Sequence, residues 1–402
     1  KNSIEFLYPE PVEGKIAQND FSARISTQYT ATESGPHSFG LHSAGRSRLK
    51  IDGQVVVDIW DDWTKGRTFF EEGCDERTGL IDLEAGKTYL IEVDLLTVPA
   101  ANLVNPAFRF GVSCPLGDEA IAEAVETAKG AETVLLFVGR SGEWDTEGSD
   151  LDHIQLPGRQ DELVKAVVAA NPNAVVVLQT GGPVEMPWLG EVPAVLQAWY
   201  PGQEVGNAVA DVLFGDAEPS GRLSQTFPMR WSDNPTESDD AEVYPGTNGN
   251  VRYAEGVFIG YRHYDAKGIT PMFPFGHGLG YTSFDISTIE ASETSGGITV
   301  DVTLKNTGTR KGSTVVQLFV SDTEASVIRP EKELKGFQKI SLAAGEEATV
   351  SIDLNPRDFA FFDVNAGVWR VEAGEFTLST GFSATDLRAS TTVSRKAEEF
   401  SK

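Results

Sequence analysis

The sequence predicts a multidomain protein in which a doubly wound α/β region lies between two all-β regions. Turn residues alternate with short β-branched runs over residues 1–115 and again after residue 282. Between these regions, apolar runs typical of buried strands alternate with helical patterns, which favours a mostly parallel sheet. The chain has 402 residues, and domains contain about 100–200 residues each, so two or three domains are expected.

The first region, residues 1–115, has the pattern of a β-sandwich. Gly35 and Gly53 lie in turn-like segments, and the segment 51–58 passes directly from such a turn into a β-branched run. The segment 83–93 repeats this order of turn and strand. We therefore assign residues 1–115 to an antiparallel sandwich.

The second region, residues 116–282, changes to alternating helices and strands. Asp118 is placed to cap an Ala-rich helix that ends at Lys129. The further elements expected in order are a strand at 133–139, a helix at 160–170, strands at 174–179 and 194–198, and a helix at 204–214. The stretch 231–282 is rich in Pro, Gly, Asn and aromatic residues, so it is expected to be a long ordered connection within this domain.

The third region, residues 283–402, is again all-β. Apolar and polar residues alternate cleanly over 298–304 and nearly so over 314–320. Turns are expected at 306–308 and 343–345. This pattern predicts an immunoglobulin-like or fibronectin-like sandwich.

An acidic loop is the first candidate for chemistry. Four carboxylates lie within eight residues on a glycine-punctuated segment that follows the strand expected at 133–139; they are Glu143, Asp145, Glu147 and Asp150. Open α/β sheets bind their ligands at the carboxyl ends of their strands, where this loop lies. Taken alone, the same residues are also typical of a solvated acidic turn.

Composition excludes several partners. The formal net charge of -27, from 60 acidic and 33 basic residues, repels phosphate backbones and anionic lipids. No basic patch compensates for it, and no apolar run approaches the ~20 residues of a membrane span. We expect neither nucleic acid nor a membrane as a partner. Residues 180–183 follow a strand but lack the spacing and lysine of a phosphate loop, which argues against a nucleotide-binding protein.

Neither a metal nor a cofactor is expected. The two cysteines, Cys74 and Cys114, cannot form a cysteine zinc site, and they are equally consistent with one disulfide or two free thiols. The five histidines are scattered along the chain. Asp61 and Asp62 resemble the paired acids with which some lectin-like domains hold calcium and a glycan, but adjacent acids are common in exposed turns, so a structural role is favoured.

Six segments in order resemble the carboxyl-terminal part of glycoside hydrolase family 3 β-glucosidases. They are 143–148 with 156–158, then 199–204, 219–223, 260–265, 273–282 and 329–337. The resemblance covers essentially the whole chain and implies an (α/β)6 sandwich followed by a fibronectin type III-like domain. Segments 34–35, 39–41, 48–53 and 83–86 make the first region similar to the protective-antigen-like sandwich inserted in some of these enzymes, with its first strand missing.

The resemblance implies a retaining β-glucosidase that cleaves terminal non-reducing β-D-glucosyl residues from β-glucosides and short oligosaccharides. Such enzymes use two carboxyl groups about 5–5.5 Å apart. The family's nucleophilic aspartate lies on a (β/α)8 barrel of roughly 250 residues, which this chain does not contain. We therefore expect a companion polypeptide that carries the barrel, the nucleophile and the missing strand.

The residue roles also follow from the resemblance. Glu147, immediately before Gly148, is the expected general acid/base, with Glu143 as the reserve choice. Trp144 is equally consistent with lining the sugar site and with packing. Leu151 stands where the family usually has arginine, which weakens that local ion pair here. The residues expected to brace the interface with the barrel are Tyr261, Arg262 and Asp265.

The alternative to an enzyme is a non-catalytic carbohydrate-binding or scaffold protein that lacks the barrel. It predicts that the chain binds sugar by itself and hydrolyses nothing. Aglycone preference, linkage, dimerisation of the assembled enzyme, and a cytoplasmic, periplasmic or secreted location are left open by the sequence.

Overall fold

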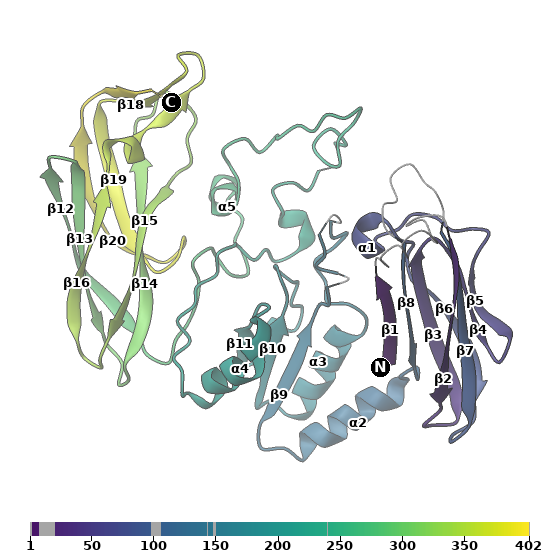
Figure 1. The fold of residues 1–402 in the computed structure, drawn as a ribbon. Helices are drawn as coiled ribbons and strands as arrows, with labels where there is room; N and C mark the ends of the chain where they lie inside the picture. The colour runs from purple at the N-terminus through teal and green to yellow at the C-terminus, as the bar shows by residue number, and fades with distance from the viewer. Residues whose placement is uncertain are drawn as a thin grey trace. The chain divides into compact units, whose positions relative to one another are not determined.

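The computed structural model describes residues 2–7, 21–97, 106–142, 144–147, 150–238 and 240–401 (Figure 1). Contacts divide the chain into two compact units, each of which is described by itself. The first unit contains residues 1–152, 157–178 and 188–196; the second contains 153–156, 179–187 and 197–402. The domain boundaries near residues 115 and 282 stay predictions. None of the described helices combines the length and apolar character that crossing a membrane requires.

The first unit begins with an antiparallel β-sandwich, as the spacing of turns and β-branched runs predicts. One described sheet has the strand order β1 (Asn2–Leu7), β8 (Ala107–Ser113), β3 (Gly35–Ala44) and β6 (Arg77–Leu83). The other has the order β2 (Ser22–Thr30), β7 (Thr88–Leu96), β4 (Arg46–Ile51) and β5 (Gln54–Ile59). Burial alternates along β2 and β7, as expected of strands with one face on a core. Fully buried Phe39, Leu49 and Phe108 belong to that core.

The first unit also contains a short helix and a three-stranded parallel sheet. The helix is α1 (Thr68–Glu71), and the described sheet has the order β11 (Ala194–Gln197), β10 (Ala174–Gln179) and β9 (Val134–Gly139). The helices α2 (Asp118–Lys129) and α3 (Gln160–Ala170) pack against each other, and a 3-10 turn, η1 (Leu189–Glu191), precedes β11. These elements confirm the predicted alternation of strands and helices. Val176, Val177 and Leu178 are fully buried in β10.

The start of α2 differs from the prediction that Asp118 caps the helix. Gly117 occupies the N-cap position without a side-chain cap, and its backbone N–H donates to Glu119 Oε1 at 3.0 Å. Asp118 is the first helical residue and pairs with Arg159 at 2.7 Å. Negative charge in the first turn is stabilised by the helix dipole, so an acid is favoured at this position as well as at the cap.

The second unit includes helix α4 (Val205–Phe214), which follows the turn η2 (Gly202–Glu204). The described part of the stretch 231–282 contains the turn η3 (Trp231–Asp233) and the helix α5 (Tyr261–Lys267). The sequence did not predict α5, because seven residues are too few to establish a helical period. Gly260 and Gly268 flank α5 with φ values of 55° and 62°, backbone angles that favour glycine.

The second unit ends in the predicted all-β sandwich. Its described sheets have the orders β12-β13-β16, β15-β14-β19-β20 and β17-β18-β21. The strands are β12 (Phe284–Thr294), β13 (Gly297–Asn306), β14 (Gly312–Asp322), β15 (Glu333–Leu342), β16 (Glu347–Leu354), β17 (Phe361–Asp363), β18 (Val368–Val371), β19 (Gly374–Gly381), β20 (Leu387–Arg395) and β21 (Glu398–Phe400), with a 3-10 turn, η4 (Pro356–Phe359). Val302, Leu318 and Leu378 are fully buried in its core. The alternation over 298–304 therefore reflects one buried and one solvated face.

Candidate active site

The acidic loop follows β9, and the end of this strand is fixed to the start of α3. The Gln160 side-chain nitrogen Nε2 donates to the carbonyl oxygens of Gly139 at 2.9 Å and Pro157 at 3.0 Å. Its Oε1 accepts from the Gly139 backbone N–H at 2.7 Å. The last residue of the strand is thereby bonded on both its N–H and C=O, so the loop leaves from a fixed point.

A buried ion pair shapes the first turn of the loop. The Arg140 side chain is fully buried, and its Nη1 lies 3.2 Å from Asp145 Oδ1. The backbone N–H groups of Trp144 and Asp145 both donate to the Ser141 carbonyl, at 2.9 and 3.1 Å. Because a buried guanidinium is strongly unfavourable without a carboxylate, Arg140 holds Asp145 inward and folds the turn around Ser141.

The other end of the loop is held by a partner from the first sandwich segment. Arg67, directly before α1, forms an ion pair with Asp152 through Nη2. Arg67 also donates its backbone N–H to Asp75 Oδ1 at 2.9 Å. Both pairs belong to the first unit, so the loop is attached on either side of Glu147.

Glu147 lies between these two attachments and differs from its acidic neighbours. Among the residues that the structure describes, no hydrogen bond or ion pair involves its carboxylate, and the side chain is exposed. Asp145 and Asp152 are ion-paired, and Asp150 also has an interaction partner. A carboxylate that no cation holds is able to donate or accept a proton at an incoming group.

The remaining predicted residues are placed as follows. Glu143 lies outside the described residues. Trp144 is half-buried on the turn next to the Arg140 pair, and its role at a sugar stays a prediction. Asp62 pairs with Arg77 at 2.5 Å, which lowers the pKa of the Asp62 carboxyl and supports its structural reading. No arrangement of three or more His, Cys, Asp or Glu side chains suited to a metal occurs in the described part of the chain.

Sequence reasoning missed the three residues that position the loop, namely Arg67, Arg140 and Gln160. For Arg140 a signal was present, because an arginine directly after a buried apolar strand needs a nearby carboxylate. Arg67 gives no such signal, since it is 85 residues from Asp152 in sequence. The hydrogen bonds of Gln160 with Gly139 form only because α3 packs close to the end of β9, so the sequence gives no local signal for them either.

The residues expected to brace a barrel contact the start of β15 and the residue before it, in the second unit. The Tyr261 hydroxyl accepts from the Leu334 backbone N–H at 2.8 Å, and Asp265 pairs with Lys332 at 2.5 Å. Arg262 lies 3.4 Å from Glu333. These contacts join α5 to the carboxyl-terminal sandwich, and contact with a barrel stays a prediction.

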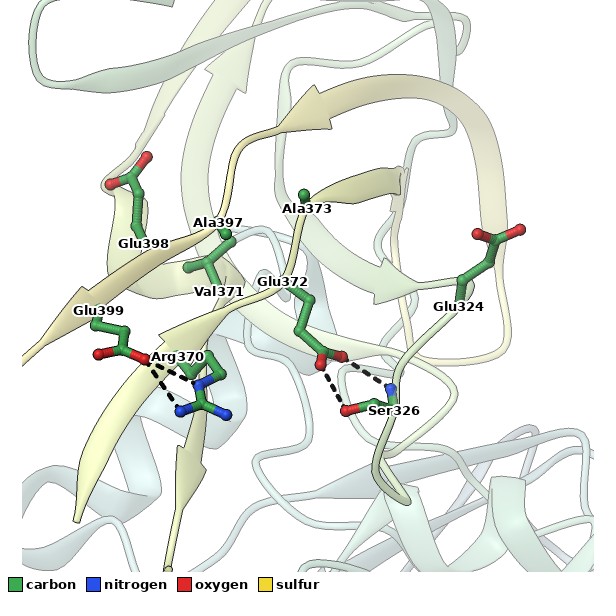
Figure 2. A pocket seen from close by; sticks show the side chains of 9 residues that line it. All are labelled: Glu324, Ser326, Arg370, Val371, Glu372, Ala373, Ala397, Glu398 and Glu399. Carbon is green, nitrogen blue, oxygen red and sulfur yellow. Dashed lines mark hydrogen bonds and ion pairs between the residues drawn. The ribbon is translucent and has the colours of Figure 1, made fainter. Parts of the chain in front are cut away.

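A second acidic region lies in the carboxyl-terminal sandwich. A cavity of about 600 Å³ is lined by residues that include Ser326, Arg370, Glu372 and Glu399. Figure 2 shows their side chains. Glu372 accepts from the Ser326 hydroxyl at 2.5 Å and from its backbone N–H at 2.8 Å, which lowers the pKa of the Glu372 carboxyl. Arg370 pairs with Glu399 at 3.0 Å. A carboxylate stabilised in its ionised form is a poor proton donor, so Glu372 does not suit acid catalysis.

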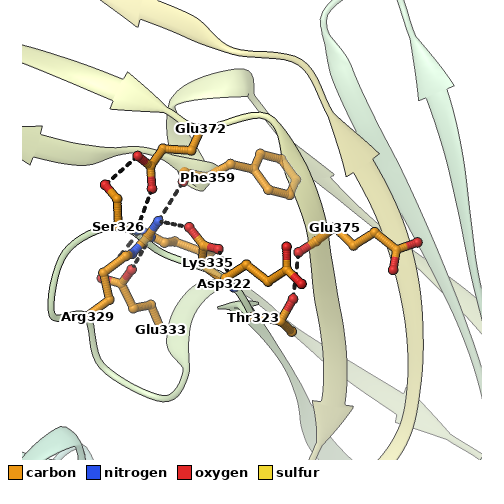
Figure 3. Close-up of polar contacts among 10 residues, drawn as sticks. Asp322, Thr323, Ser326, Arg329, Glu333, Lys335, Phe359, Glu372 and Glu375 are labelled. Atoms are coloured by element: carbon orange, nitrogen blue, oxygen red, sulfur yellow. Dashed lines mark hydrogen bonds and ion pairs between the residues drawn. The ribbon is translucent and has the colours of Figure 1, made fainter.

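A buried arginine also organises the neighbouring turn. Arg329 pairs with Asp322 at 3.0 Å and with Glu333 at 2.7 Å. Figure 3 shows these side chains together. The Arg329 guanidinium donates in addition to the Phe359 carbonyl at 3.0 Å. The side chains of Arg329 and Asp322 are each 6% exposed. The segment 329–337, one of the six that resemble the family, is therefore fixed by charge inside the sandwich.

Two parts of the chain match known protein families. Residues 15–281 match the glycosyl hydrolase family 3 C-terminal domain, and residues 314–384 match the fibronectin type III-like domain. The first match includes the acidic loop. The second includes Arg329 and the core strands β14 and β19.

Similar proteins include several β-glucosidases. The chain is 52% identical to a β-glucosidase of Rhizobium radiobacter over 97% of this chain and 48% of that protein. A crystal structure of the Kluyveromyces marxianus β-glucosidase in complex with glucose has a TM-score of 0.88 and 36% identity, covering 99% of this chain and 50% of that chain. One from Streptomyces venezuelae in complex with D-glucose has a TM-score of 0.71 and 35% identity, covering 92% of this chain and 46% of that one. The chain thus spans about half the length of these relatives.

Proposed function

The chain belongs to glycosyl hydrolase family 3, and from that premise we propose that it supplies the general acid/base of a retaining β-glucosidase. The proposed substrates are β-glucosides and short oligosaccharides with a terminal non-reducing β-D-glucosyl residue. Two similar solved β-glucosidases hold glucose, which supports a glucosyl unit at the site.

The observation that carries the proposal is the state of Glu147. It has an exposed carboxylate without a partner among the described residues, on a loop whose two ends are held by ion pairs. A general acid needs a carboxyl group that can hold and release a proton, placed on a rigid support. Glu147 lies between these two ion pairs and belongs to neither, whereas Asp145 and Asp152 are themselves ion-paired, which supports Glu147 over both.

In the proposed reaction, Glu147 first donates a proton to the glycosidic oxygen as the bond to the anomeric carbon breaks. The nucleophilic carboxylate then holds the glucosyl group covalently. Glu147, now ionised, accepts a proton from the water that releases glucose. Arg140 keeps Asp145 inward throughout, so that the carboxylate of Glu147 is presented to the substrate.

The nucleophile is proposed to lie on a (β/α)8 barrel outside these 402 residues, carried by a companion polypeptide. The support is that the chain spans about half the length of its β-glucosidase relatives. We also propose that the first sandwich is a protective-antigen-like insertion and that the parallel sheet is part of an (α/β)6 sandwich. In support, the match to the family domain extends back to residue 15, within the first region.

The test of Glu147 is the Glu147→Gln variant in natively purified enzyme. Loss of general acid/base catalysis typically costs about 10²–10⁴-fold in rate. We expect a loss of this size on cellobiose, a much smaller loss in the first step on an aryl glucoside with a good leaving group, and partial recovery with azide. Azide attacks the glucosyl-enzyme directly and needs no base.

Two matched variants make the result specific. Glu143→Gln removes the reserve carboxylate, and Glu162→Gln removes an exposed carboxylate that pairs with Arg159. Both should keep activity within a few-fold of the parent enzyme. A Glu147→Gln enzyme that keeps its activity on cellobiose, or a Glu143→Gln enzyme that alone shows azide recovery, would show that Glu147 is not the acid/base.

The companion polypeptide is tested separately by denaturing intact-mass spectrometry of the same material. A second chain of barrel size in equal amount is the expected result. One longer chain that contains these 402 residues would contradict the companion but leave the assignment of Glu147 intact. This chain alone, without hydrolytic activity, would favour a binding protein.

A further inference from the structure

A cysteine and a histidine lie together in the first unit, at one end of the two central strands of a sheet of the first sandwich. His37 is on β3 and Cys114 directly follows β8, and these two strands pair antiparallel up to Ser38 opposite Ser113. The Cys114 Sγ lies 3.5 Å from His37 Nε2. His37 is 1% exposed, whereas Cys114 is partly accessible to solvent. The strand register thus places a reachable thiol against a buried imidazole.

The hydrogen bonds of His37 decide which ring nitrogen faces the thiol. Nδ1 lies 3.0 Å from the Gly35 carbonyl oxygen, and a carbonyl only accepts, so Nδ1 carries the proton of the neutral ring. Nε2 is then left with its lone pair directed at Cys114. Tyr29 packs edge-on against the imidazole with ring centroids 5.9 Å apart and helps to hold its orientation. Cys114 is therefore the donor of the S–H···N bond.

The groups around this pair favour proton transfer within it. Burial raises the pKa of Tyr29, with further contributions from the charges of Cys114 and Glu33. Tyr29 is therefore neutral near pH 7 and adds no charge beside the thiol. In the ladder that flanks β3 on its other side, the residue opposite His37 is Ile81, which cannot titrate. His37 is the base in contact with the sulfur.

We propose that Cys114 and His37 form a thiol modification site that exchanges with low-molecular-weight disulfides. His37 Nε2 accepts the proton of the Cys114 thiol, and the thiolate attacks one sulfur of the disulfide. A new S–S bond forms to Cys114 as the S–S bond of the reagent breaks. The departing thiolate takes up a proton, which the imidazolium supplies, so electrons and protons balance without a further oxidant.

The second thiol of the chain provides an internal control. Cys74 is buried, and its Sγ accepts from the Ser43 backbone N–H at 3.3 Å. Burial raises the pKa of Cys74, and the contacts found for its sulfur come from Ser43 and include no imidazole. Both thiols are free, so they can be compared in one protein. Cys74 should react slowly.

The test treats the folded chain with dithiodipyridine, a neutral disulfide that the net negative charge of the protein does not repel. The labelled cysteine is identified by peptide mass spectrometry over time. A free thiol is only a few per cent ionised near pH 7, so a neighbouring base should make Cys114 react about tenfold faster than an unassisted cysteine. Cys74 should stay unlabelled over the same period. Equal labelling of the two thiols would overturn the proposal.

Two variants separate the base from the packing. His37→Gln keeps a polar group but removes the base, and should slow labelling of Cys114 about tenfold near pH 7. Tyr29→Phe keeps the ring contact with His37 and should leave the rate unchanged. If His37→Gln does not fold, the labelling rate of Cys114 in the parent chain is measured as a function of pH instead. A rate that falls less than tenfold per pH unit below pH 8 supports the pair, and a full tenfold fall overturns it.

Discussion

The acidic loop and the Arg329 turn both use a buried arginine, but they differ in what the arginine leaves unpaired. Arg140 holds Asp145, and the exposed Glu147 on the same loop has no partner among the described residues. Arg329 pairs with both Asp322 and Glu333. The Arg140 pair therefore fixes a loop and leaves the Glu147 carboxylate without an ion pair. The Arg329 pairs use their carboxylates only to fix a turn.

The difference shows how acidic residues can be sorted by structure. A carboxylate that accepts charged or multiple hydrogen bonds is stabilised in its ionised form, as the lowered pKa of Glu372 illustrates. Such groups stabilise a fold but release no proton near neutral pH. In the proposed enzyme, the catalytic carboxylate is the one that the ion pairs support without contacting it.

The largest expected effect on stability comes from Arg329→Met. This change leaves buried Asp322 without its cation and removes the nearest cation of Glu333, which keeps Arg262 at 3.4 Å. Removing one partner of a buried pair typically costs about 3–5 kcal/mol in unfolding free energy. Urea unfolding should show this loss, and the catalytic rate per folded enzyme should stay near that of the parent. A fall in that rate would mean that the two regions are coupled.

Arg140→Met should destabilise less, by about 3 kcal/mol, because only Asp145 loses a cation. Its distinguishing effect is on the proposed activity, which should fall at least tenfold on cellobiose because the loop no longer holds Glu147 in place. The matched variant is Arg140→Met with Asp145→Asn, which removes the unpaired charge. Recovery of stability without recovery of rate is expected, and unchanged rates in both variants would contradict a positioning role for Arg140.

A third ionic contact, in the first sandwich, extends the comparison to pH. Asp94 pairs with Arg24 at 2.5 Å and Lys50 at 2.8 Å, and the hydrogen bond from Arg24 lowers the pKa of Asp94 to about 2. An unfolded aspartate has a pKa of about 3.9, so this contribution is present above pH 4 and lost as the pH falls towards 2.

The variant Asp94→Asn should cost about 1–2 kcal/mol at neutral pH, since the pair is partly screened by solvent, and almost nothing near pH 2. The protection of β7 amides from hydrogen exchange, compared between Asp94→Asn and the parent at neutral pH and near pH 2, measures the cost at each pH. An equal cost at both pH values would show that the lost stability comes from packing and not from charge.

The smallest effect is expected for Ser326→Ala. It removes the hydroxyl bond to Glu372 but keeps the backbone N–H bond, so the loss should be at most about 1 kcal/mol at neutral pH. Because the folded pKa of Glu372 is lowered, the loss should diminish as the pH falls through that value. Thermal melts at pH 7 and about pH 3 test this. A loss that grows in acid would mean that the carboxyl is protonated in the folded protein.

The longer helices and strands of the α/β region could be predicted well, because each shows its hydrophobic pattern over many residues and has start and stop residues at its ends. The helix predicted over 160–170 and the strand over 174–179 have the observed bounds. The helix α5 and the glycine cap of α2 were missed, since a seven-residue helix and a one-residue shift leave little trace in composition. Local signals thus determine long elements and leave short ones undecided.

The sequence by itself determined the order of all-β, α/β and all-β regions, the family resemblance and the acidic loop as the place to seek chemistry. These depend on local alternation of apolar and polar residues and on short contiguous motifs. Only the tertiary structure decided that Arg67 reaches Asp152, that Arg140 turns inward to Asp145, and that His37 faces Cys114. Such pairs form between residues far apart in the chain or through burial of a charge, and both depend on how strands and helices pack, which no local pattern records.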